Sequence, residues 1–366
     1  MKIAYITSSL EGGGTQLSIP AVTRVLREAG AHVEVFALTR RDGRALPAML
    51  ADGLKVHIRE GSDRDHLAAI RWLGDELTAY QPTLIWTSVS RASIIGLLLA
   101  WRDKIPVVCW QHNAALKFSR HILFHILRKR PAMWVGDSDM VTAITGKRFD
   151  VPPERLASWP LFCTNPDAPL ATPWQAGQTL RLGSLGRLHS QKAYDVLIEA
   201  IVLLKQRGFV APIPIEIAIA GDGRDHQTLA NMIERNGISE INLLGYTEKP
   251  LDFLAGLHLY LQPSRLEGLC ISMHEAMQAG LPVIATAVGQ MPYSLDQGKS
   301  GWLIPPNDVN ALADALIDAL SHPEKLAEMG QFARAKVLSQ YSQDKFRQAG
   351  ESILQRLQSQ GLLNSA

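Results

Sequence analysis

The sequence predicts an α/β protein built from two halves, each with its own parallel sheet. Short β-like apolar runs alternate with amphipathic helical runs along 366 residues, a length that suits two domains. The alternation stops in a stretch rich in Pro, Ala and Gly, residues 161–178, and then starts again. We therefore expect two Rossmann-like domains that face each other across a deep cleft. The expected parts are an N-terminal domain over 1–163, a linker over 164–179, a C-terminal domain over 180–345, and a helix over 346–366 that can fold back on the first domain.

Composition excludes several classes of protein. Hydrophobic residues make up 46% of the chain and charged residues 20%, as in a soluble globular protein. Residues 1–163 hold 21 Lys+Arg against 15 Asp+Glu, a net of +6, and the remainder holds 16 against 20, a net of −4. This balance is too mild for a nucleic-acid binder, so no nucleic-acid partner is expected, but it is compatible with a first half that faces an anionic surface.

The termini, apolar runs and cysteines predict a cytoplasmic protein. The N-terminus has one positive residue and a short apolar run, without the core or cleavage site of a signal peptide. The longest apolar run, 94–101, is far below the roughly 20 residues that a membrane span needs. The three cysteines are odd in number and far apart, so neither a disulfide framework nor a zinc site is expected.

In the first half, each expected strand is a short apolar run followed by a turn or a helix. The first strand leads into Gly12-Gly13-Gly14 and a helix over about Ser18–Ala29, which Gly30 ends. The expected strands are Lys2–Ser8, His32–Leu38, Leu54–Arg59, Thr83–Thr87, Val107–Gln111 and Met133–Val135.

In the second half the same pattern returns. Helices are expected over Tyr194–Arg207, up to Asn236 after the turn Gly221-Asp222-Gly223, over Met273–Ala279, and along the tail from Ala311 onward. The expected strands are Leu180–Leu188, Ile215–Ala220, Ile241–Leu244, Leu257–Gln262 and Pro282–Ala287. Ligands of such sheets bind beyond the carboxyl ends of the strands, and every motif below falls at such an end.

The most informative stretch is Ser264–Gly301, which contains two carboxylates, Glu267 and Glu275. Glu267 should lie in the loop before a helix and Glu275 on the early turns of that helix. The backbone N–H groups of residues 268–271 would point into the space between them, where unpaired N–H groups and the helix dipole favour phosphate. An anion flanked by two carboxylates that bind hydroxyls indicates a nucleotide sugar.

Two cations, Arg187 and Lys192, lie five residues apart across a strand-to-helix loop. We expect Arg187 to close the strand and Lys192 to open the helix, so that both meet at a helix N-terminus. This arrangement suits a diphosphate leaving group, whose growing charge an Arg fork and a Lys point charge stabilise. Two solvated surface cations are the alternative.

Three further motifs each have an ordinary structural alternative. Gly12-Gly13-Gly14 would let backbone approach a phosphate or sugar, but a plain tight turn is equally consistent, since Gln16 and Leu17 stand where a G-x-G-x-x-G fingerprint needs glycine. His112 ends an apolar strand inside the expected cleft, where it is either functional or a packed core histidine. Asp137-Ser138-Asp139 matches a D-x-D metal motif but directly precedes a helix, so we interpret it as an N-cap and expect no metal.

The segment Lys117–Arg130 contains five Lys/Arg, two His and no acid, with apolar residues along one helical face. It is either a core-packed helix with a basic outer face or an interfacial helix that touches anionic lipid headgroups.

Taken together, these motifs resemble the retaining family 4 glycosyltransferases of the GT-B fold, the glycosyl transferases group 1. The resemblance covers nearly the whole chain, and it is carried by the segments GGGTQ, WQHN, GRLHSQK, AGDG and PSRLEGLCISMHEAMQAGLPVIAT. It implies transfer of a hexose from a nucleoside diphosphate sugar, with UDP favoured over GDP, to a glycan or lipid-linked hydroxyl, without a cofactor or metal. Work in cell-envelope, exopolysaccharide or lipopolysaccharide biosynthesis is expected.

The resemblance also implies roles for individual residues. Arg187 and Lys192 would hold the donor diphosphate, Glu267 the transferred sugar, and Glu275 the ribose hydroxyls. His112 would lie near the transferred sugar, so the catalytic residues implied are His112, Arg187, Lys192 and Glu267. Other donor-binding positions implied are Gly13, Gly14, Gly221, Gly223, Gly268, Leu269, Cys270 and Ile271, and Gln16 would face the acceptor.

Two departures from the family pattern lie close to the sugar position. Leu269-Cys270 replaces an aromatic-glycine pair, and residues 290–293 read Gln-Met-Pro-Tyr in place of Gly-x-Pro-Glu. Donor identity therefore cannot be inherited from a better-known member. A nucleotide-sugar epimerase or hydrolase of the same fold, and a non-catalytic GT-B-like scaffold, are the alternatives.

Overall fold

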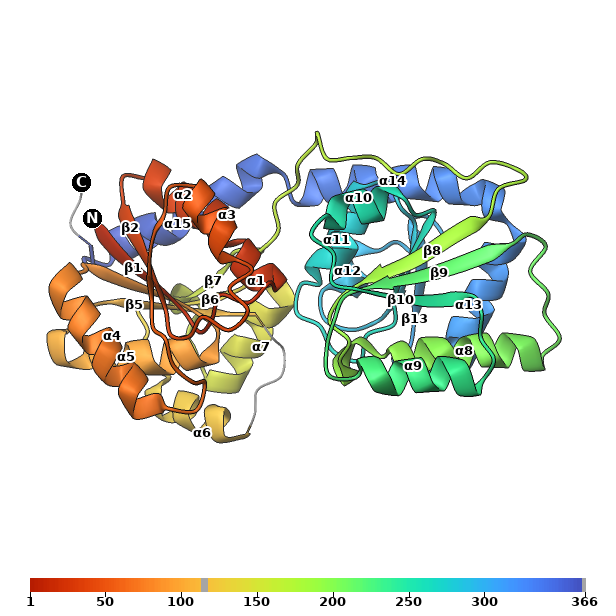
Figure 1. Cartoon of the computed structure of the whole chain (residues 1–366). Helices are drawn as coiled ribbons and strands as arrows, with labels where there is room; N and C mark the ends of the chain where they lie inside the picture. The colour runs from red at the N-terminus through yellow and green to blue at the C-terminus, as the bar shows by residue number, and fades with distance from the viewer. Residues whose placement is uncertain (113–117, 364–366) are drawn as a thin grey trace. The chain divides into compact units, whose positions relative to one another are not determined.

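The computed structural model describes residues 1–112 and 118–363 and divides into two units, each built on a parallel sheet (Figure 1). The first unit comprises Met1–Phe162 together with Asp344–Ala366, and the second comprises Cys163–Gln343. The last long helix therefore belongs to the first unit, in which Gly350 lies against the Trp159 ring.

The first sheet has seven strands in the order β3-β2-β1-β4-β5-β6-β7, and all neighbouring pairs are parallel. Its strands are β1 Lys2–Thr7, β2 His32–Ala37, β3 Lys55–Ile58, β4 Leu84–Ser88, β5 Val107–Gln111, β6 Met133–Gly136 and β7 Leu156–Ser158. Its helices are α1 Gly14–Leu17, α2 Ile19–Glu28, α3 Leu46–Ala51, α4 His66–Tyr80, α5 Ser90–Asp103, α6 Phe118–Leu127, α7 Asp139–Phe149, the 3-10 turn η1 Pro153–Arg155, and α15 Gln343–Ser359.

The second sheet has six strands in the order β10-β9-β8-β11-β12-β13, again all parallel. Its strands are β8 Leu180–Leu185, β9 Ile215–Ala220, β10 Ile241–Gly245, β11 Leu259–Gln262, β12 Val283–Thr286 and β13 Gly301–Ile304. Its helices are η2 Ser190–Lys192, α8 Tyr194–Gln206, α9 His226–Arg235, α10 Pro250–Ala255, α11 Ile271–Gln278, α12 Met291–Ser294, α13 Val309–Ser321, η3 Pro323–Lys325 and α14 Leu326–Gln340.

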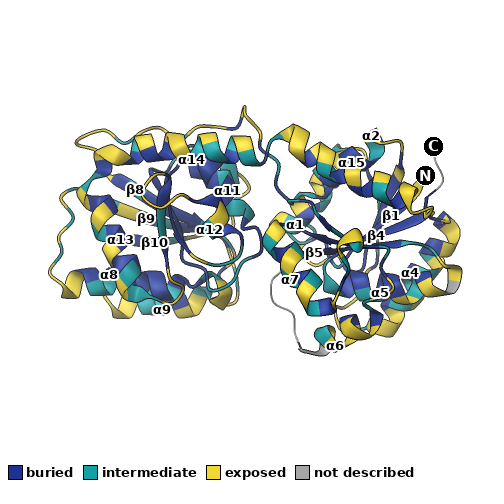
Figure 2. Ribbon diagram, turned by 180° about the vertical axis from the view of Figure 1, so that it is seen from behind, coloured by how far each residue is buried: buried dark blue, intermediate teal, exposed yellow. Residues whose placement is uncertain are grey.

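Both sheets are covered by helices on both faces, which explains why their strands are almost continuously apolar (Figure 2). In the first unit, one face packs α4, α5 and α6 around Ile6, Ile85 and Trp134. The other face holds three fully buried indoles, Trp86, Trp110 and Trp159, with ring centroids 4.9–6.0 Å apart. In the second unit, α8 and α13 pack on one face around residues such as Leu197, Ile217 and Leu316.

The expected elements are confirmed with small shifts at their ends. The strands over Val107–Gln111 and Ile215–Ala220 have the expected bounds, and the helix expected over about Ser18–Ala29 is α2, which begins at Ile19 with Ser18 as its N-cap. Two strands were missed, β7 and β13, and so were the short helices α1, α3, α10 and α12. The strand expected over Leu180–Leu188 is too long, because β8 ends at Leu185 and Gly186–Leu188 pair with the β9 loop instead.

Candidate active site at the carboxyl edge of the second sheet

The carboxyl ends of β8 and β11 bring Lys192 and Glu267 into direct contact across 75 residues of sequence. The Lys192 Nζ atom donates a hydrogen bond to Glu267 Oε1 at 2.8 Å. The side chains are only 20% and 11% exposed, so the pair is largely shielded from water. Burial acts to lower the pKa of Lys192, but the Glu267 carboxylate, with smaller contributions from Cys270, Tyr194 and Tyr260, raises it by more, so the net shift of the pKa is upward. Lys192 is therefore a fixed cation at neutral pH.

Glu267 is held by one of its two oxygens. Besides Lys192, Ser264 Oγ donates to Glu267 Oε1 at 2.6 Å and Gln262 Nε2 donates to the same oxygen at 3.2 Å. No described residue donates a hydrogen bond to the second oxygen, Oε2. The carboxylate is thus fixed in place with one oxygen left to accept hydrogen bonds from a ligand.

Buried polar side chains beside the Glu267 carboxylate hold its hydrogen-bond donors in place. Gln262 Nε2 also donates to Ser264 Oγ at 2.7 Å, and Gln262 Oε1 accepts from Tyr260 Oη at 2.9 Å. The Thr286 hydroxyl donates to the Ser264 carbonyl at 2.5 Å. Gln262 and Ser264 have no exposed surface, and the hydrogen bonds fix their rotamers. Glu267 therefore sits on a rigid base.

Arg265 connects the turn that carries Lys192 to the loop that carries Glu267. Its guanidinium forms a bidentate pair with Asp195 at 2.7 and 2.8 Å and also donates to the Ser190 carbonyl at 2.8 Å. Its backbone N–H donates to the Gln191 carbonyl at 2.8 Å. The charge-assisted pair lies across the turn that carries Lys192, so Arg265 acts as a positioning residue for that lysine.

The helix that follows Glu267 begins at a strained residue. Cys270, the residue before α11, has φ +64° and ψ +68°, in the left-handed region that glycine favours. No side chain caps this helix, and within the described part of the chain the N–H groups of Gly268, Leu269, Cys270 and Ile271 donate to no other residue. Four unpaired donors and the positive end of the helix dipole therefore lie beside Glu267, as an anion site requires.

His274 fixes the first turn of α11 from inside. Its Nδ1–H donates to the Cys270 carbonyl at 2.9 Å, so its Nε2 accepts from Ser294 Oγ at 2.7 Å, and Ser294 lies 3.1 Å from Tyr341 Oη. The ring has no exposed surface, and burial lowers the pKa of His274 to about 4. It is therefore a neutral structural histidine that ties Cys270 to α12 and to the end of α14.

Glu275, on the second turn of α11, is in a different state from Glu267. Burial raises the pKa of Glu275 to about 7, and no described residue forms a hydrogen bond or ion pair with its carboxyl group. A half-buried carboxyl without a partner is an acceptor for ligand hydroxyls. The prediction that Glu267 precedes a helix and Glu275 lies on its early turns is confirmed.

Two positions at this edge of the sheet have no room for a side chain, which explains why both are glycine. A Cβ on Gly221, at φ +146°, would lie 1.9 Å from the Gly186 carbonyl oxygen, and one on Gly223 would lie 2.3 Å from that of Leu188. The two loops after β8 and β9 therefore pack backbone to backbone, which holds the Arg187 loop in place. Arg187 itself is exposed. The prediction that Arg187 closes the strand is wrong, because β8 ends two residues before it. The prediction that Lys192 opens the helix is also wrong, because Lys192 lies in the 3-10 turn η2 ahead of α8.

The predicted residues of the first half lie at the carboxyl edge of the first sheet. His112 directly follows β5, and its Nε2 lies 2.8 Å from Ser88 Oγ at the end of β4. Its buried Nδ1 has no hydrogen-bond partner in the described part of the chain, and the Asp137 carboxylate is 3.7 Å away. Gly13 and Gly14 begin α1, and Gln16, on the same helix, is buried.

Other motifs have ordinary structural roles. Ser138 is the N-cap of α7 and accepts from the Val141 N–H, which confirms the interpretation of Asp137-Ser138-Asp139 as a helix start. Among the described residues, no cluster of three His, Cys, Asp or Glu side chains could hold a metal ion. No helix within residues 1–112 and 118–363 is long and apolar enough to span a bilayer.

Sequence reasoning missed Gln262, Ser264, Arg265 and His274. A signal was present for the first two, because polar residues at the end of an otherwise buried strand need partners. Nothing in the spacing indicated that Arg265 would reach Asp195, or that His274 would face Ser294.

Comparisons with known proteins agree with this architecture. Residues 175–336 match the model of the family described as glycosyl transferases group 1. The amylovoran biosynthesis glycosyltransferase AmsK of Erwinia amylovora is 32% identical over 49% of this chain and 46% of its own length, so the chain spans about half the length of the first curated relatives it matches. The D-inositol 3-phosphate glycosyltransferase of Kribbella flavida is 24% identical over 88% of this chain and 86% of its own length.

Two solved structures share the fold over nearly the whole chain. Anabaena HepE, in complex with UDP and glucose, superposes with a TM-score of 0.84 at 18% identity, covering 97% of this chain and 99% of that one. TarM from S. aureus, in a complex that includes UDP, gives 0.74 at 15% identity over the full length of both chains. The protein therefore has a GT-B fold, and residues 175–336 of its second unit match the glycosyl transferases group 1.

Proposed function

We propose that this protein is a retaining glycosyltransferase that moves a hexose from a nucleoside diphosphate sugar to a hydroxyl of a glycan or lipid-linked acceptor. The observation that carries the proposal is the shielded Lys192–Glu267 pair beside four unpaired N–H groups of residues 268–271. Cations and N–H donors fit a diphosphate, and a fixed carboxylate with one available oxygen fits sugar hydroxyls.

Each group then has a role in the second unit. Arg187, Lys192 and the N–H groups of Gly268, Leu269, Cys270 and Ile271 stabilise the departing diphosphate. Glu267 Oε2 accepts from the hexose, and Glu275 accepts from the ribose. Gly221 and Gly223 keep the donor loops in close contact.

The first unit contributes further groups to the proposed reaction. We place His112 near the transferred sugar, Gly13 and Gly14 at the donor, and Gln16 at the acceptor. Gln16 is buried in α1, so this last role requires its side chain to become accessible when the acceptor binds.

The proposed chemistry is a front-face, dissociative displacement. The bond between the anomeric carbon and the diphosphate oxygen breaks while the acceptor oxygen bonds to the same face, and the proton of the acceptor hydroxyl passes to the departing diphosphate oxygen, so the configuration is retained. Charge on the leaving group is stabilised by Lys192, Arg187 and the start of α11, and we propose that no metal or cofactor is needed. Activity should then survive EDTA.

UDP is the favoured nucleotide, with GDP as the second choice. The support is indirect: HepE and TarM were solved with UDP. The relatives AmsK and poly(ribitol-phosphate) alpha-N-acetylglucosaminyltransferase carry polymer names, which supports a place in cell-envelope or exopolysaccharide synthesis for this protein, including lipopolysaccharide synthesis.

The first experiment is a thermal-shift panel of UDP- and GDP-sugars. A ligand specific to the native state at 100 times its Kd stabilises by about 2.7 kcal/mol, which is readily seen as a rise in melting temperature. The hit is then tested for transfer to soluble acceptors and for the anomeric configuration of the product. No shift with any nucleotide sugar would contradict the proposal and favour a non-catalytic scaffold.

An epimerase or hydrolase of the same fold is the second candidate. It would use the same donor contacts but turn over the nucleotide sugar without an added acceptor. Turnover that requires the acceptor therefore excludes this candidate.

We also propose a cytoplasmic protein that contacts the anionic face of a membrane through residues 117–130. Lys117 lies outside the described residues, but Phe118–Leu127 form the helix α6, and Arg128, Lys129 and Arg130 follow it. No carboxylate lies in this segment.

A further inference from the structure

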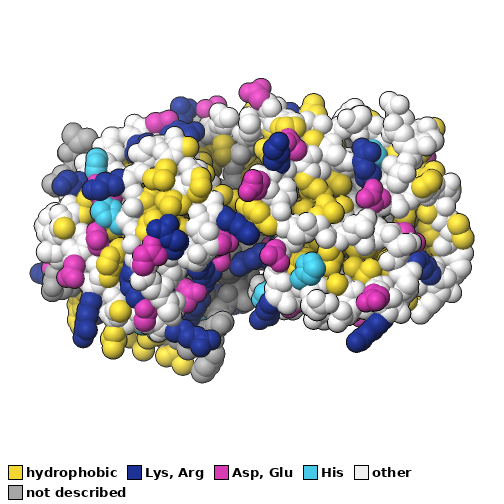
Figure 3. All heavy atoms as spheres, in the orientation of Figure 1, with side chains coloured by type: hydrophobic (Ala, Val, Ile, Leu, Met, Phe, Trp, Pro, Cys, Tyr) yellow, Lys and Arg dark blue, Asp and Glu magenta, His cyan; other side chains and the backbone are white. Residues whose placement is uncertain are grey.

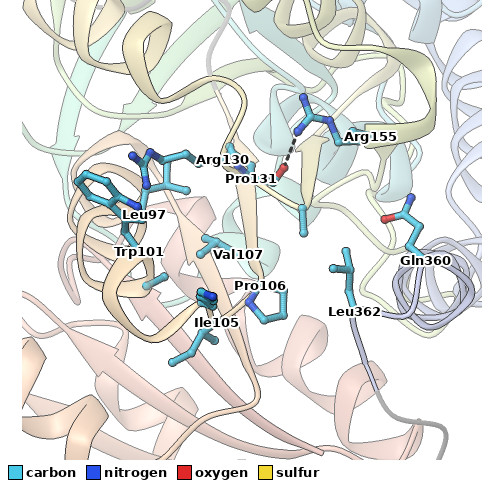
Figure 4. Close-up of a pocket in the computed structure, with 13 residues that line it drawn as sticks. Leu97, Trp101, Ile105, Pro106, Val107, Arg130, Pro131, Arg155, Gln360 and Leu362 are labelled. Carbon is cyan, nitrogen blue, oxygen red and sulfur yellow. Dashed lines mark hydrogen bonds between the residues drawn. The ribbon is translucent and has the colours of Figure 1, made fainter.

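A hollow of about 390 Å³ lies in the first unit, between α5, the starts of β5 and β6, and the end of the chain (Figure 4). Apolar walls come from residues such as Leu97, Ile105, Pro106, Val107 and Leu362. Trp101 and Arg130 lie on one side of the hollow, and Arg155 and Gln360 lie on the other. This part of the molecule takes no part in the proposed reaction.

The polar rim of the hollow has one sign of charge. Lys104, Arg130 and Arg155 line it, and no carboxylate is among its described lining residues. The acids nearest in sequence, Asp103 and Glu154, are outside the lining. Arg155 is fixed by donating to the Lys129 carbonyl at 2.8 Å and the Pro131 carbonyl at 3.3 Å.

Arg130 and Trp101 form the entrance together. The Arg130 guanidinium carbon lies 3.8 Å from the centroid of the Trp101 ring, a cation–π contact. Trp101 is nevertheless 66% exposed, so a large amphipathic ring stands at the surface beside a cation. Exposed tryptophans beside cations are typical of protein surfaces that enter the boundary between the headgroups and the acyl chains of a membrane.

An exposed apolar face continues from this entrance. Exposed large aliphatic side chains on α5 and α6 are Leu98, Ile122, Leu123 and Ile126, of which Ile126 is 69% exposed. Hydrophobic side chains gather along the lower edge of the unit drawn on the left in Figure 3, over α5 and α6, with Lys and Arg side chains beside them. We call Leu98, Trp101, Ile122, Leu123 and Ile126 the α5–α6 face.

The hollow lies at the amino edge of the first sheet. Pro106 directly precedes β5 and Pro131 precedes β6, whereas Ser88 and His112 mark the carboxyl ends of β4 and β5. The hollow and the predicted reaction residues of this unit are therefore at opposite ends of the same strands. A ligand in the hollow would not occupy the reaction site.

We propose that the hollow binds the phosphate headgroup of an anionic phospholipid while the α5–α6 face enters the membrane surface. The three cations meet the headgroup phosphate, and Trp101 and Ile126 reach the acyl boundary. This inference rests on the proposed membrane contact, which it locates and gives a headgroup preference, and it does not require that the protein transfers a sugar. Cations together with exposed apolar groups are the two signals that reversible membrane binding needs.

The test is co-sedimentation of the full chain with vesicles of phosphatidylcholine, with and without phosphatidylglycerol. We expect binding to the anionic vesicles, and a fall of about tenfold or more when Lys104→Glu and Arg130→Glu are combined. Arg64→Glu with Arg71→Glu is the matched control, because it makes the same change of net charge on exposed residues of the first unit. The control should change binding by less than about threefold.

A fluorescence experiment tests the apolar part separately. Phosphatidylcholine brominated in the acyl chain, mixed with phosphatidylglycerol, should quench tryptophan fluorescence in the wild type and much less in Trp101→Phe. Trp101→Ser should also weaken binding, whereas Leu67→Ser, at a 74% exposed leucine on α4, should not. These exposed positions leave the fold intact, so a result is obtained even if the charge variant is unstable.

Several results would overturn the inference. Equal binding to neutral and anionic vesicles removes the headgroup role, and equal loss in the control pair reduces the effect to net charge. A dimer in light scattering that Trp101→Ser dissociates would mean that a second copy covers the α5–α6 face instead. Thermal shifts with UDP-sugars should be unchanged in all these variants, so failure here is distinguishable from failure of the proposed enzyme activity.

Discussion

The two sheets share one strand order over six strands, to which the first sheet adds β7, and a residue of positive φ lies at the same topological position in both. Strand β4 lies beside the first strand of its unit, as β11 lies beside β8, and a helix follows each. The residue before that helix is Val89, at φ +67°, in the first unit and Cys270, at φ +64°, in the second. Neither is glycine, although this backbone region favours glycine strongly. Each of these two strand-to-helix connections thus contains a residue of positive φ, although ψ is +158° at Val89 and +68° at Cys270.

The side chains around the two turns differ. In the second unit, Glu267 accepts three hydrogen bonds and Arg265 locks the neighbouring turn. In the first unit, the buried His112 Nδ1 and Gln111 Nε2 have no hydrogen-bond partner among the described residues. The Glu267 carboxylate is therefore held by three donors before any ligand binds, whereas among the described residues His112 is held by hydrogen bonding through its Nε2 atom alone. Topology positions both edges, but only the second is organised in advance.

The largest expected effect removes the cation from the organised edge. Lys192→Ala should lower kcat at saturating donor by about 10²–10³-fold, because the leaving diphosphate loses a charge partner. Lys205→Ala is the matched control, since Lys205 makes an exposed ion pair with Glu240 in the same unit. Unchanged turnover in Lys192→Ala, measured with saturating UDP-sugar, would remove the leaving-group role.

The counterpart at the less organised edge is His112. His112→Ala should lower kcat by about 10²-fold while the thermal shift with UDP stays at its wild-type value, because the groups that we propose bind the nucleoside diphosphate are in the second unit. Ser88→Ala, which removes only the 2.8 Å contact to Nε2, should cost far less. If His112→Ala instead abolished the UDP shift, the division of labour between the two edges would be wrong.

The protonation of Glu275 should make both the stability of the protein and its affinity for the donor depend on pH. Burial raises its pKa to about 7, so the folded protein without ligand loses stability as the pH rises from about 4.5 to 7, where the folded carboxyl must ionise in a buried place. In the proposed role, ribose hydroxyls donate to the ionised form, so affinity for the UDP-sugar identified in the thermal-shift panel should rise severalfold between about pH 6 and pH 8. Titration calorimetry of Glu275→Gln should show a flat profile, and a profile as steep as that of the wild type would assign the effect elsewhere.

The smallest effects concern the two strained turns themselves. Val89→Gly should raise the free energy of unfolding by about 1 kcal/mol and Cys270→Gly by somewhat less, since relief of strain is partly offset by the entropy of glycine in the unfolded chain. Thermal melting should rise by about 2–4 °C per kcal/mol. Cys270→Ala keeps the backbone strain and should give no gain; an equal gain there would point to the thiol instead.

The fold was predictable because parallel strands buried on both faces are nearly continuous apolar runs. Val107–Gln111 and Ile215–Ala220 are such runs with clear flanks, and their bounds were found. Strand β7 is only three residues long and ends in Ser158, and β13 is four residues that begin with a glycine. Too little periodicity remains in such short strands to distinguish them from loops.

The candidate site was predictable as separate residues but not as a network. Local motifs identified Lys192 and Glu267 individually, because each follows a strand. Their direct hydrogen bond depends on β8 and β11 being neighbours in the sheet, which follows from strand order and not from spacing. The state of Glu275 depends on burial, which no short sequence window determines.

The division of the chain affects how it matures on the ribosome. The second unit is a continuous segment, 163–343, whereas the first needs α15, whose Ile353, Leu354 and Leu357 are buried. The nascent chain can complete the core of the second unit before that of the first, although the first begins to emerge earlier. A polypeptide that stops short of residue 344 would leave the groove for α15 open around Trp159 and attract chaperones.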